Sequence, residues 1–330
     1  MGLEYVGMKK HVLWLALCAS LLSVNVSCES DNSQSSSSLG SSSSETSSSS
    51  SSSSSDVSSS SSSSTSSEVS SSSSNSTSSS SSSSSSSEIG SDNHYYDDID
   101  FSKTGAQLKS ELADLISDHE VHTYNDLWQG YYSTDVDEEG HIIDIYSTSE
   151  YTPGKDQNKG SAKKEGDNYN REHVIPQSIF NKRSPMVSDI FHILPTDSYV
   201  NNKRDNYPFA EVSSASYTST NGTKVGSSAT SGVSGTVCEP IDEYKGDIAR
   251  IYFYFVTCYQ DKMSSFNSFA PFSKNSFPSL SNWAIDLYME WSKNDPVSER
   301  EIERNQACYE YQNNRNPFVD IPGLEEQIWG

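Results

Sequence analysis

Residues 168–212 read NYNREHVIPQSIFNKRSPMVSDIFHILPTDSYVNNKRDNYPFAEV, and they carry the only concentrated group of chemically active side chains in the chain. A polar segment leads into a short apolar run, and Thr196-Asp197-Ser198 after that run is typical of a helix cap. The pattern predicts a strand that ends at His173, a loop, a second strand that contains His192, and a helix whose first turns carry Asn201.

This order of side chains suits the hydrolysis of a phosphodiester, which needs a base that activates water and a cation that holds the developing negative charge. A neutral histidine is the natural base near pH 7, and His173 follows directly after Glu172. One carboxylate and one amide carbonyl, from Glu172 and Asn201, make a hard oxygen site that suits Mg²⁺, with Ca²⁺ or Mn²⁺ as alternatives. Lys203 and Arg204 are candidates for binding the flanking phosphates.

The stretch resembles the signature of the bacterial endonuclease I family, a group of ββα-metal (His-Me finger) nucleases. The matching pieces are Asn170-Arg171-Glu172-His173, Pro176-Gln177-Ser178, Asp189 to Asp197, Val200-Asn201-Asn202-Lys203-Arg204 and Asn206-Tyr207-Pro208-Phe209. The resemblance implies that His173 is the general base, while Glu172 and Asn201 hold one divalent cation. It also implies cleavage that leaves a 5′-phosphate.

The resemblance extends over nearly the whole of 105–330. Further matches are Asp144, Tyr146-Ser147, Glu239-Pro240, Asp242 to Asp247, Asn305, the run from Asn313 to Phe318, Asp320 and Trp329. The fold that it implies is α+β, with a ββα-metal finger embedded in a mostly helical single domain. We place this catalytic domain at residues 93–330.

Several other polar residues, in or near the matched pieces, are candidates for substrate binding or for support of the site. Arg171 joins Lys203 and Arg204 as a candidate phosphate-binding side chain. His192 matches a family histidine in the second strand, and we expect it to support the site rather than to act as a second base. Arg250, Asn305 and Arg315 are polar enough to touch substrate, but we expect hydrogen bonds within the fold from all three.

The beginning of the chain predicts export. Met8-Lys9-Lys10 precedes an apolar run over 12–26, which is too short to span a bilayer and typical of a secretory signal. Cys28 after this run resembles a bacterial lipidation site, although Asn25 occupies a position where an apolar residue is usual. We therefore expect a signal peptide over 1–28 and an extracytoplasmic protein, either secreted or held in the cell envelope as a lipoprotein through Cys28. An ordinary signal peptide with an incidental cysteine remains the alternative.

Residues 29–92 consist almost entirely of serine with scattered Asp, Glu, Thr and Asn. Such a segment has too little apolar surface to offset the entropy of ordering, so it is predicted to be a disordered linker. A flexible chain of about 60 residues spans on the order of 40–45 Å, which would separate a catalytic domain from an anchoring surface.

The charge of the chain is uneven. The formal net charge is −23, which argues against general nucleic-acid binding. Residues 155–204 nevertheless contain nine basic side chains against six acidic ones, a local net charge of +3. This reversal favours a phosphate-binding face over the alternative of a solvated basic loop, and a bound cation would add positive charge there.

The remaining patterns complete the predicted domain. They indicate helices over 105–120 and 125–132, a strand over 141–146, a surface hairpin within 213–236, a buried helix within 238–260, and helices over 283–291 and 298–312. Cys238, Cys258 and Cys308 could supply one disulfide and one free thiol. Alternatively, those on helices are simply buried apolar residues. Zinc-ligand spacings and the His-Glu-x-x-His motif are absent from the sequence.

The sequence therefore predicts an exported, monomeric, metal-dependent endonuclease that cuts DNA, and as a second substrate RNA, without sequence preference. Its only expected contact with a membrane is the lipid anchor. Two other classes remain open: an exported ribonuclease, and a non-catalytic surface module that binds nucleic acid or carbohydrate. Indifference to metal and to His173→Ala would identify a binding module.

Overall fold

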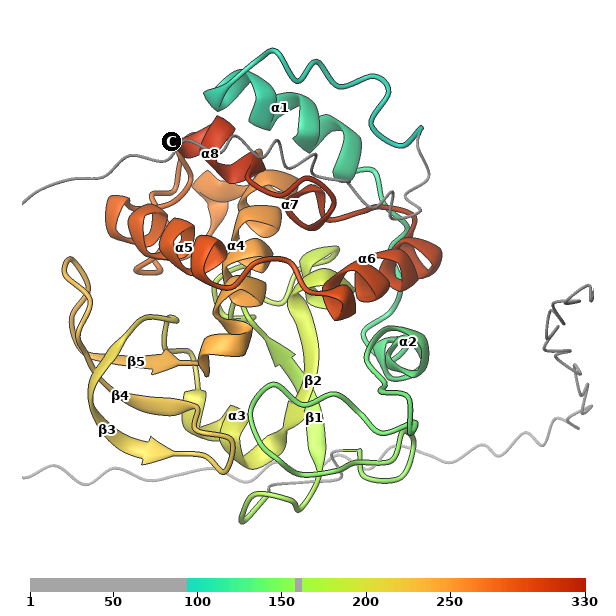
Figure 1. Cartoon of the computed structure of the whole chain (residues 1–330), viewed down its shortest axis with the longest axis vertical. Helices are drawn as coiled ribbons and strands as arrows, with labels where there is room; N and C mark the ends of the chain where they lie inside the picture. Colours follow the sequence, from blue (N-terminus) through green and yellow to red (C-terminus); the bar gives the residue numbers. More distant parts are fainter. Residues whose placement is uncertain (1–93, 158–161) are drawn as a thin grey trace, which may run out of the picture. The chain divides into compact units, whose positions relative to one another are not determined.

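The computed structural model describes residues 94–157 and 162–330. The expected signal peptide, Cys28 and the serine-rich segment 29–92 lie outside the described residues. Within the described ranges, helices and two small sheets form the α+β architecture that the sequence predicts (Figure 1).

The helices of the described ranges are α1 (Gly105–Ile116), α2 (Leu127–Thr134), α3 (Ser198–Arg204), α4 (Lys245–Cys258), α5 (Asn282–Asn294), α6 (Glu299–Gln312), α7 (Pro317–Asp320) and α8 (Leu324–Trp329). The strands are β1 (Tyr169–His173), β2 (Ile193–Asp197), β3 (Val212–Thr218), β4 (Lys224–Ser228) and β5 (Thr236–Glu239). Short 3-10 turns are η1 (Met186–Ser188), η2 (Ile190–His192), η3 (Asp242–Tyr244) and η4 (Met263–Ser265).

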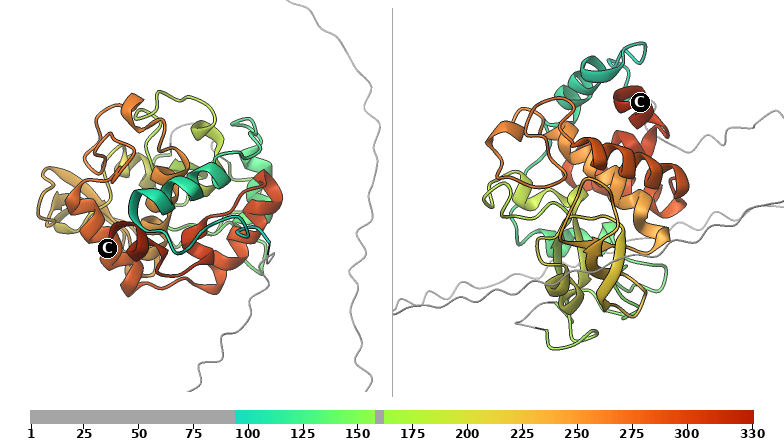
Figure 2. Two further views of the ribbon diagram at one scale, coloured as in Figure 1. Left: turned by 90° about the horizontal axis from the view of Figure 1, so that it is seen from above. Right: turned by 90° about the vertical axis from the view of Figure 1, so that its left-hand side faces the viewer.

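Helix α4 is the centre of the helical part. Every residue from Gly246 to Cys258 is buried, which is the pattern of a helix enclosed on all sides. It packs against α1, α5, α7 and the η2 turn, and Figures 1 and 2 show these helices gathered on one side of the two sheets. The ring of Phe255 on α4 lies 4.8 Å from the ring of His192, so the helical core reaches directly to the segment before β2.

The strand, loop, strand and helix predicted around His173 correspond to β1, β2 and α3. β1 pairs antiparallel with β2, and His173 is the last residue of β1, opposite Ile193. The carboxylate of Asp197 caps α3 by accepting hydrogen bonds from the backbone N–H groups of Tyr199 and Val200. This cap sets where α3 begins, and therefore which of its side chains turn toward β1.

The second sheet has the order β3-β4-β5 and is antiparallel. β3 and β4 form the predicted hairpin, whereas β5 was not expected, since it lies between the predicted hairpin and the predicted buried helix. Gly226 on β4 is required there: a Cβ atom at this position would lie 2.1 Å from the carbonyl oxygen of Ser214.

Three predictions about local structure are wrong. α1 ends at Ile116 instead of Glu120, since Ser117 and the polar residues after it favour a helix end. The predicted strand over 141–146 forms only an isolated bridge, because the N–H groups of Ile142 and Ile143 bond to two different segments. His192 lies in η2, just before β2, because the Asp189 side chain accepts a hydrogen bond from Phe191 N and tightens the chain into a turn.

The remaining helix predictions are confirmed in outline. α5 and α6 cover the predicted 283–291 and 298–312, and α6 begins with a capping box formed by Ser298 and Glu301. Cys258 and Cys308 are buried free thiols on helices, which agrees with the alternative that they act as apolar packing residues, and Cys238 on β5 is also a buried free thiol. In the described ranges, none of the helices has the length and apolar character needed to cross a membrane.

Candidate active site

The two faces of β1 carry different chemistry. Side chains alternate along a strand, so Asn170 and Glu172 share one face while Arg171 and His173 share the other. The first face packs against α3, where Asn201 and Arg204 lie three residues apart and therefore on one side of the helix. Glu172 and Asn201, the predicted cation ligands, consequently lie along the same β1–α3 interface.

Glu172 is buried and partly neutralised. It is 1% exposed, and its Oε1 atom accepts hydrogen bonds from the Tyr146 hydroxyl at 2.9 Å and from Arg204 Nη1 at 2.5 Å. Burial raises the pKa of the carboxyl to about 7, against the opposing effects of Arg204 and Tyr146. Its two hydrogen bonds to described residues thus both end on one oxygen.

Arg204 has a different place from the one expected of a phosphate-binding side chain. It is 1% exposed, and besides Glu172 its guanidinium donates to the carbonyl oxygens of His173, Val174 and Tyr207 at 2.7, 2.5 and 3.1 Å. These bonds tie the end of α3 to the end of β1. In this structure Arg204 therefore holds the two elements together and orients Glu172.

Asn201 is half-buried and oriented by a neighbour. Its Nδ2 atom donates to Oδ1 of Asn170 at 2.6 Å, which fixes the amide and leaves the carbonyl oxygen as the atom for a further partner. A carboxylate and an amide carbonyl are both hard oxygen donors. The side chains on this interface therefore fit a divalent cation of the Mg²⁺ or Ca²⁺ type.

His173 lies on the opposite face of β1 and is 4% exposed. Its Nε2 atom is 3.3 Å from the carbonyl oxygen of Val187. A carbonyl can only accept, so Nε2 carries the proton in the tautomer that makes this bond. Burial, followed by the nearby His192, holds the pKa of the ring well below its usual range, so the ring is neutral near pH 7. With the proton on Nε2, Nδ1 is the ring nitrogen that keeps a free lone pair.

Aromatic and basic side chains line the His173 side of β1. The Tyr124 and His192 rings each lie 5.7 Å from the His173 ring. The guanidinium of Arg171 stacks over Tyr124 at 3.5 Å and Trp128 at 4.4 Å, and Nη1 donates to the Tyr124 carbonyl. Arg171 is thus half-buried beside the candidate base.

Lys203 is the exposed basic residue of α3. Its ammonium lies 5.0 Å from the ring centre of Tyr199 and 5.6 Å from that of Tyr217. In contrast to Arg204, it projects from the outer side of the helix. The structure therefore separates two neighbouring cations that look alike in the sequence.

A second group of metal-type ligands lies elsewhere. Atoms of His119, Asp189 and Cys258 come within 4.8 Å of one another, and all three residues are buried. The Asp189 carboxylate already accepts from Tyr254 and Tyr259 hydroxyls, Gln312 Nε2 and Phe191 N. Since these donors occupy both of its oxygens, the group fits a structural hydrogen-bond network better than a cation.

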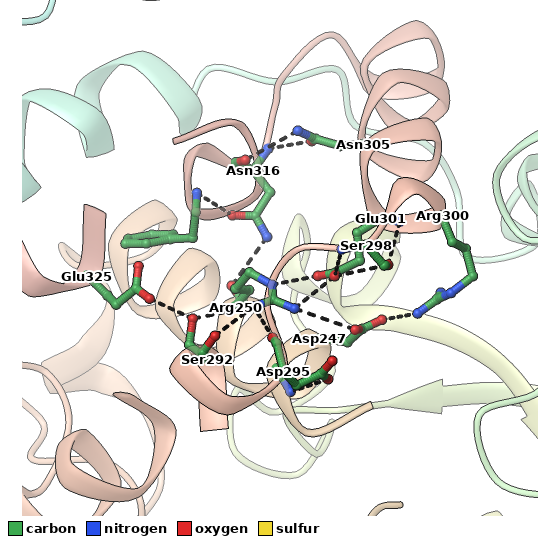
Figure 3. A network of polar contacts seen from close by, with 12 residues as sticks. Asp247, Arg250, Ser292, Asp295, Ser298, Arg300, Glu301, Asn305, Asn316 and Glu325 are labelled. Atoms are coloured by element: carbon green, nitrogen blue, oxygen red, sulfur yellow. Dashed lines mark hydrogen bonds and ion pairs between the residues drawn. The ribbon is translucent and has the colours of Figure 1, made fainter. Parts of the chain in front are cut away.

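Arg250, Asn305 and Arg315, which we expected to be structural, form hydrogen bonds and ion pairs within the fold. Arg250 forms a two-pronged ion pair with Glu301 (Figure 3). Asn305 bonds to the backbone of Asn316. Arg315 binds Asp320 through two nitrogens. Each satisfies groups of the fold, as the sequence predicted.

Two residues at the site were not singled out in advance. Tyr146 donates to Glu172, and its only sequence signal was its position in a matched Tyr-Ser pair. Val187 acts through its backbone carbonyl, a group that every residue carries, so the sequence gives no signal for it. Such contacts depend on how the loop between β1 and β2 folds back onto His173.

Comparison with known proteins adds an independent line of information. The family model described as Endonuclease I matches residues 104–323. A protein named "Extracellular ribonuclease" from Bacillus subtilis (strain 168) is 33% identical over 251 residues, which cover 71% of this chain and 78% of that protein. One of the same name from Bacillus amyloliquefaciens is 33% identical over 234 residues, covering 69% and 75%.

Proposed function

Since the chain belongs to the endonuclease I family, and is thus a nuclease that hydrolyses phosphodiesters, we propose that it is an exported endonuclease that cuts DNA and RNA without sequence preference. The observation that carries this proposal is the arrangement around β1. A neutral histidine with a bare Nδ1 ends the strand, and two hard oxygen ligands line the strand's packed face.

In the proposed reaction, His173 Nδ1 takes a proton from water as the water attacks phosphorus. The bond from phosphorus to the 3′-oxygen breaks, and this oxygen takes a proton from solvent, which leaves a 5′-phosphate and a 3′-hydroxyl. The proton already on Nε2 points to Val187, which keeps the lone pair of Nδ1 available. Arg204 and Tyr146 hold Glu172, and Asn170 holds Asn201.

The endonuclease I family is generally dependent on a divalent metal, and Glu172 and Asn201 would hold one such ion, most simply Mg²⁺. When bound, the ion would stabilise negative charge on the phosphate and on the leaving oxygen. Arg171 and Lys203 are the proposed phosphate-binding side chains, because both lie at the edge of the site and carry a fixed positive charge.

RNA is the second substrate for a specific reason: both relatives are named extracellular ribonucleases. Their names also support export, which agrees with the signal peptide expected over 1–28 and with lipidation of Cys28 as a proposed anchor. We propose that the chain acts outside the cytoplasm as a monomer.

The test uses the full chain with supercoiled plasmid and with a single-stranded RNA, in the presence of Mg²⁺, Mn²⁺ or Ca²⁺ and with a chelator. We expect metal-dependent cleavage of both substrates, and its loss in His173→Ala. Cleavage of RNA alone would replace the proposal by an exported ribonuclease. A folded chain that binds but cuts neither substrate would favour a non-catalytic binding module.

A further inference from the structure

His173 has a second histidine beside it that the proposed mechanism does not use. The rings of His173 and His192 lie 5.7 Å apart at an angle of 71°. His192 is fully buried, and the rings of Phe180 and Phe255 lie 5.9 and 4.8 Å from it. It is therefore screened from any substrate and can act only through its neighbours.

The two histidines are held in the same way by two successive carbonyl groups. His192 Nε2 lies 2.6 Å from the carbonyl oxygen of Met186, and His173 Nε2 lies 3.3 Å from that of Val187. Both acceptors belong to the η1 turn. In the tautomer that makes these bonds, each ring carries its proton on Nε2, and neither Nδ1 atom meets the geometry of a hydrogen bond to the described residues.

The hydrogen bond of His173 to Val187 is longer than that of His192 to Met186. A contact of 3.3 Å is at the long end for an N–H···O bond, so the Val187 carbonyl is a weak restraint if it is free to turn. The bond of 2.6 Å to the preceding residue is short, and it fixes the turn from inside the core. Asp189, directly after η1, anchors the other end through Gln312 and two tyrosine hydroxyls.

We propose that His192 is a positioning residue for the base. Its hydrogen bond to Met186 holds the η1 turn so that the Val187 carbonyl keeps the proton of His173 on Nε2 and Nδ1 bare. The inference rests on the proposed function only in naming His173 as the base. It adds a defined role for a buried histidine that never touches the substrate.

The direct readout is the protonation pattern of the His173 ring, measured by two-bond ¹⁵N–¹H NMR on the full chain with ¹⁵N-labelled histidine. His192→Leu removes the donor, and His192→Gln keeps an N–H close to the position of Nε2. His122→Leu is the matched control, because His122 Nε2 is also 2.6 Å from a backbone carbonyl, that of Tyr311, away from η1.

We expect the wild type and His192→Gln to show His173 protonated on Nε2, and His192→Leu to show a mixture of the two neutral forms. The turnover number kcat should fall about tenfold in His192→Leu, about 1.4 kcal/mol, with KM little changed and with partial recovery in His192→Gln. His122→Leu should leave both the ring pattern and kcat unchanged.

Three results would overturn the proposal: a wild type with the His173 proton on Nδ1, an unchanged His173 pattern in folded His192→Leu, or the same change in His122→Leu. The wild-type measurement applies even if His192→Leu does not fold. A fixed His173 ring that depends on His192, in a chain that cuts no nucleic acid, would support the positioning role while refuting the proposed function.

Discussion

The described part of the chain contains two buried Glu–Arg pairs, and they are built differently. Glu301 on α6 receives Arg250 Nε on one oxygen at 2.6 Å and Arg250 Nη2 on the other at 2.8 Å, and Ser298 adds two further donors (Figure 3). Glu172 on β1 receives Arg204 through a single nitrogen, and Tyr146 bonds to the same oxygen. Both glutamates are nearly inaccessible to solvent.

The difference fits the roles proposed for the two pairs, a structural one for Glu301–Arg250 and a cation-binding one for Glu172. A two-pronged pair that occupies both carboxylate oxygens is geometrically complete and leaves little for another ligand to bind. A pair that uses one oxygen holds the carboxylate in place and leaves the second oxygen able to bind another ligand. Burial of a charged pair is therefore uninformative about function until the occupancy of each oxygen is known.

The largest expected effect is at His173, the proposed base, which follows Glu172 on β1. His173→Ala should lower kcat on nucleic acid by about 10²–10⁴-fold, the range for loss of a general base, because no other ring replaces Nδ1 at the end of β1. Single-turnover cleavage of plasmid DNA in Mg²⁺ measures this. His122→Ala, which removes a half-buried histidine bound to the Tyr311 carbonyl, is the matched control and should keep full activity.

The next prediction concerns the two glutamates themselves. Glu172→Gln and Glu301→Gln each leave a buried arginine without its carboxylate, so each should lower the free energy of unfolding by about 3–5 kcal/mol. Denaturant unfolding measures that loss. The same titrations repeated with Mg²⁺ distinguish the two sites, because a ligand stabilises only the state that binds it.

Mg²⁺ should stabilise the wild type and Glu301→Gln but not Glu172→Gln. Where the variants are folded, the wild type and Glu301→Gln should cleave nucleic acid and Glu172→Gln should not. An equal response to Mg²⁺ in both variants would mean that Glu172 does not hold the cation, and the comparison between the pairs would lose its functional meaning.

The sequence could predict part of this site because its signals are local. Asp197 as a helix cap fixes the start of α3, and strand alternation separates Glu172 from His173. The spacing of residues along α3 contains a further signal that the sequence analysis did not use. Asn201 and Arg204 share one helix face, whereas Lys203 projects elsewhere, so Arg204 could have been recognised as an inward residue.

The rest depends on tertiary packing. The Glu172–Arg204 pair joins residues that are 32 positions apart, and the Glu301–Arg250 pair joins residues 51 apart. Neither partner could be chosen from local patterns, because several acids and bases of the chain are equally close in sequence. The Val187 carbonyl is still less predictable, since its position is set by the whole loop between β1 and β2.

A third buried carboxylate, that of Asp144, extends the comparison to a site without an arginine. Its hydrogen bonds come from uncharged groups: the Tyr146 N–H at 2.9 Å, the Ser147 hydroxyl at 2.6 Å and the backbone of Asp197. Burial raises the pKa of this carboxyl from 3.8 to about 7, and the nearby charge of Asp197 adds to the increase. Folded Asp144 thus binds a proton more tightly than unfolded Asp144.

The sign of the resulting pH effect follows from proton linkage. Between about pH 4 and 7 the folded state binds more protons at Asp144 than the unfolded state, so the stability from this group is present at low pH and lost as pH rises through 7. The loss is at most about 4 kcal/mol at 1.36 kcal/mol per pKa unit. Denaturant unfolding from pH 4 to 8 should show a smaller loss in Asp144→Asn than in the wild type, because Glu172, whose pKa is also raised to about 7, still contributes to the loss in the variant. Asp118→Asn, at an exposed position, is the control and should keep the wild-type profile. Parallel profiles for the wild type and Asp144→Asn would contradict it.

The smallest expected effect is at Lys203, on the outer side of α3. If its exposed charge contacts a phosphate while the buried charge of Arg204 only holds Glu172, Lys203→Ala should weaken nucleic-acid binding a few-fold and leave kcat nearly unchanged. The slope of log affinity against log salt should decrease by about 0.7–0.9, the value for one phosphate contact. Binding of catalytically inactive His173→Ala, with and without Lys203→Ala, measures this without cleavage. Lys293→Ala on α5 removes an exposed lysine in the last turn of another helix, and an equal change in slope there would show that Lys203 contributes only to the general charge of the chain.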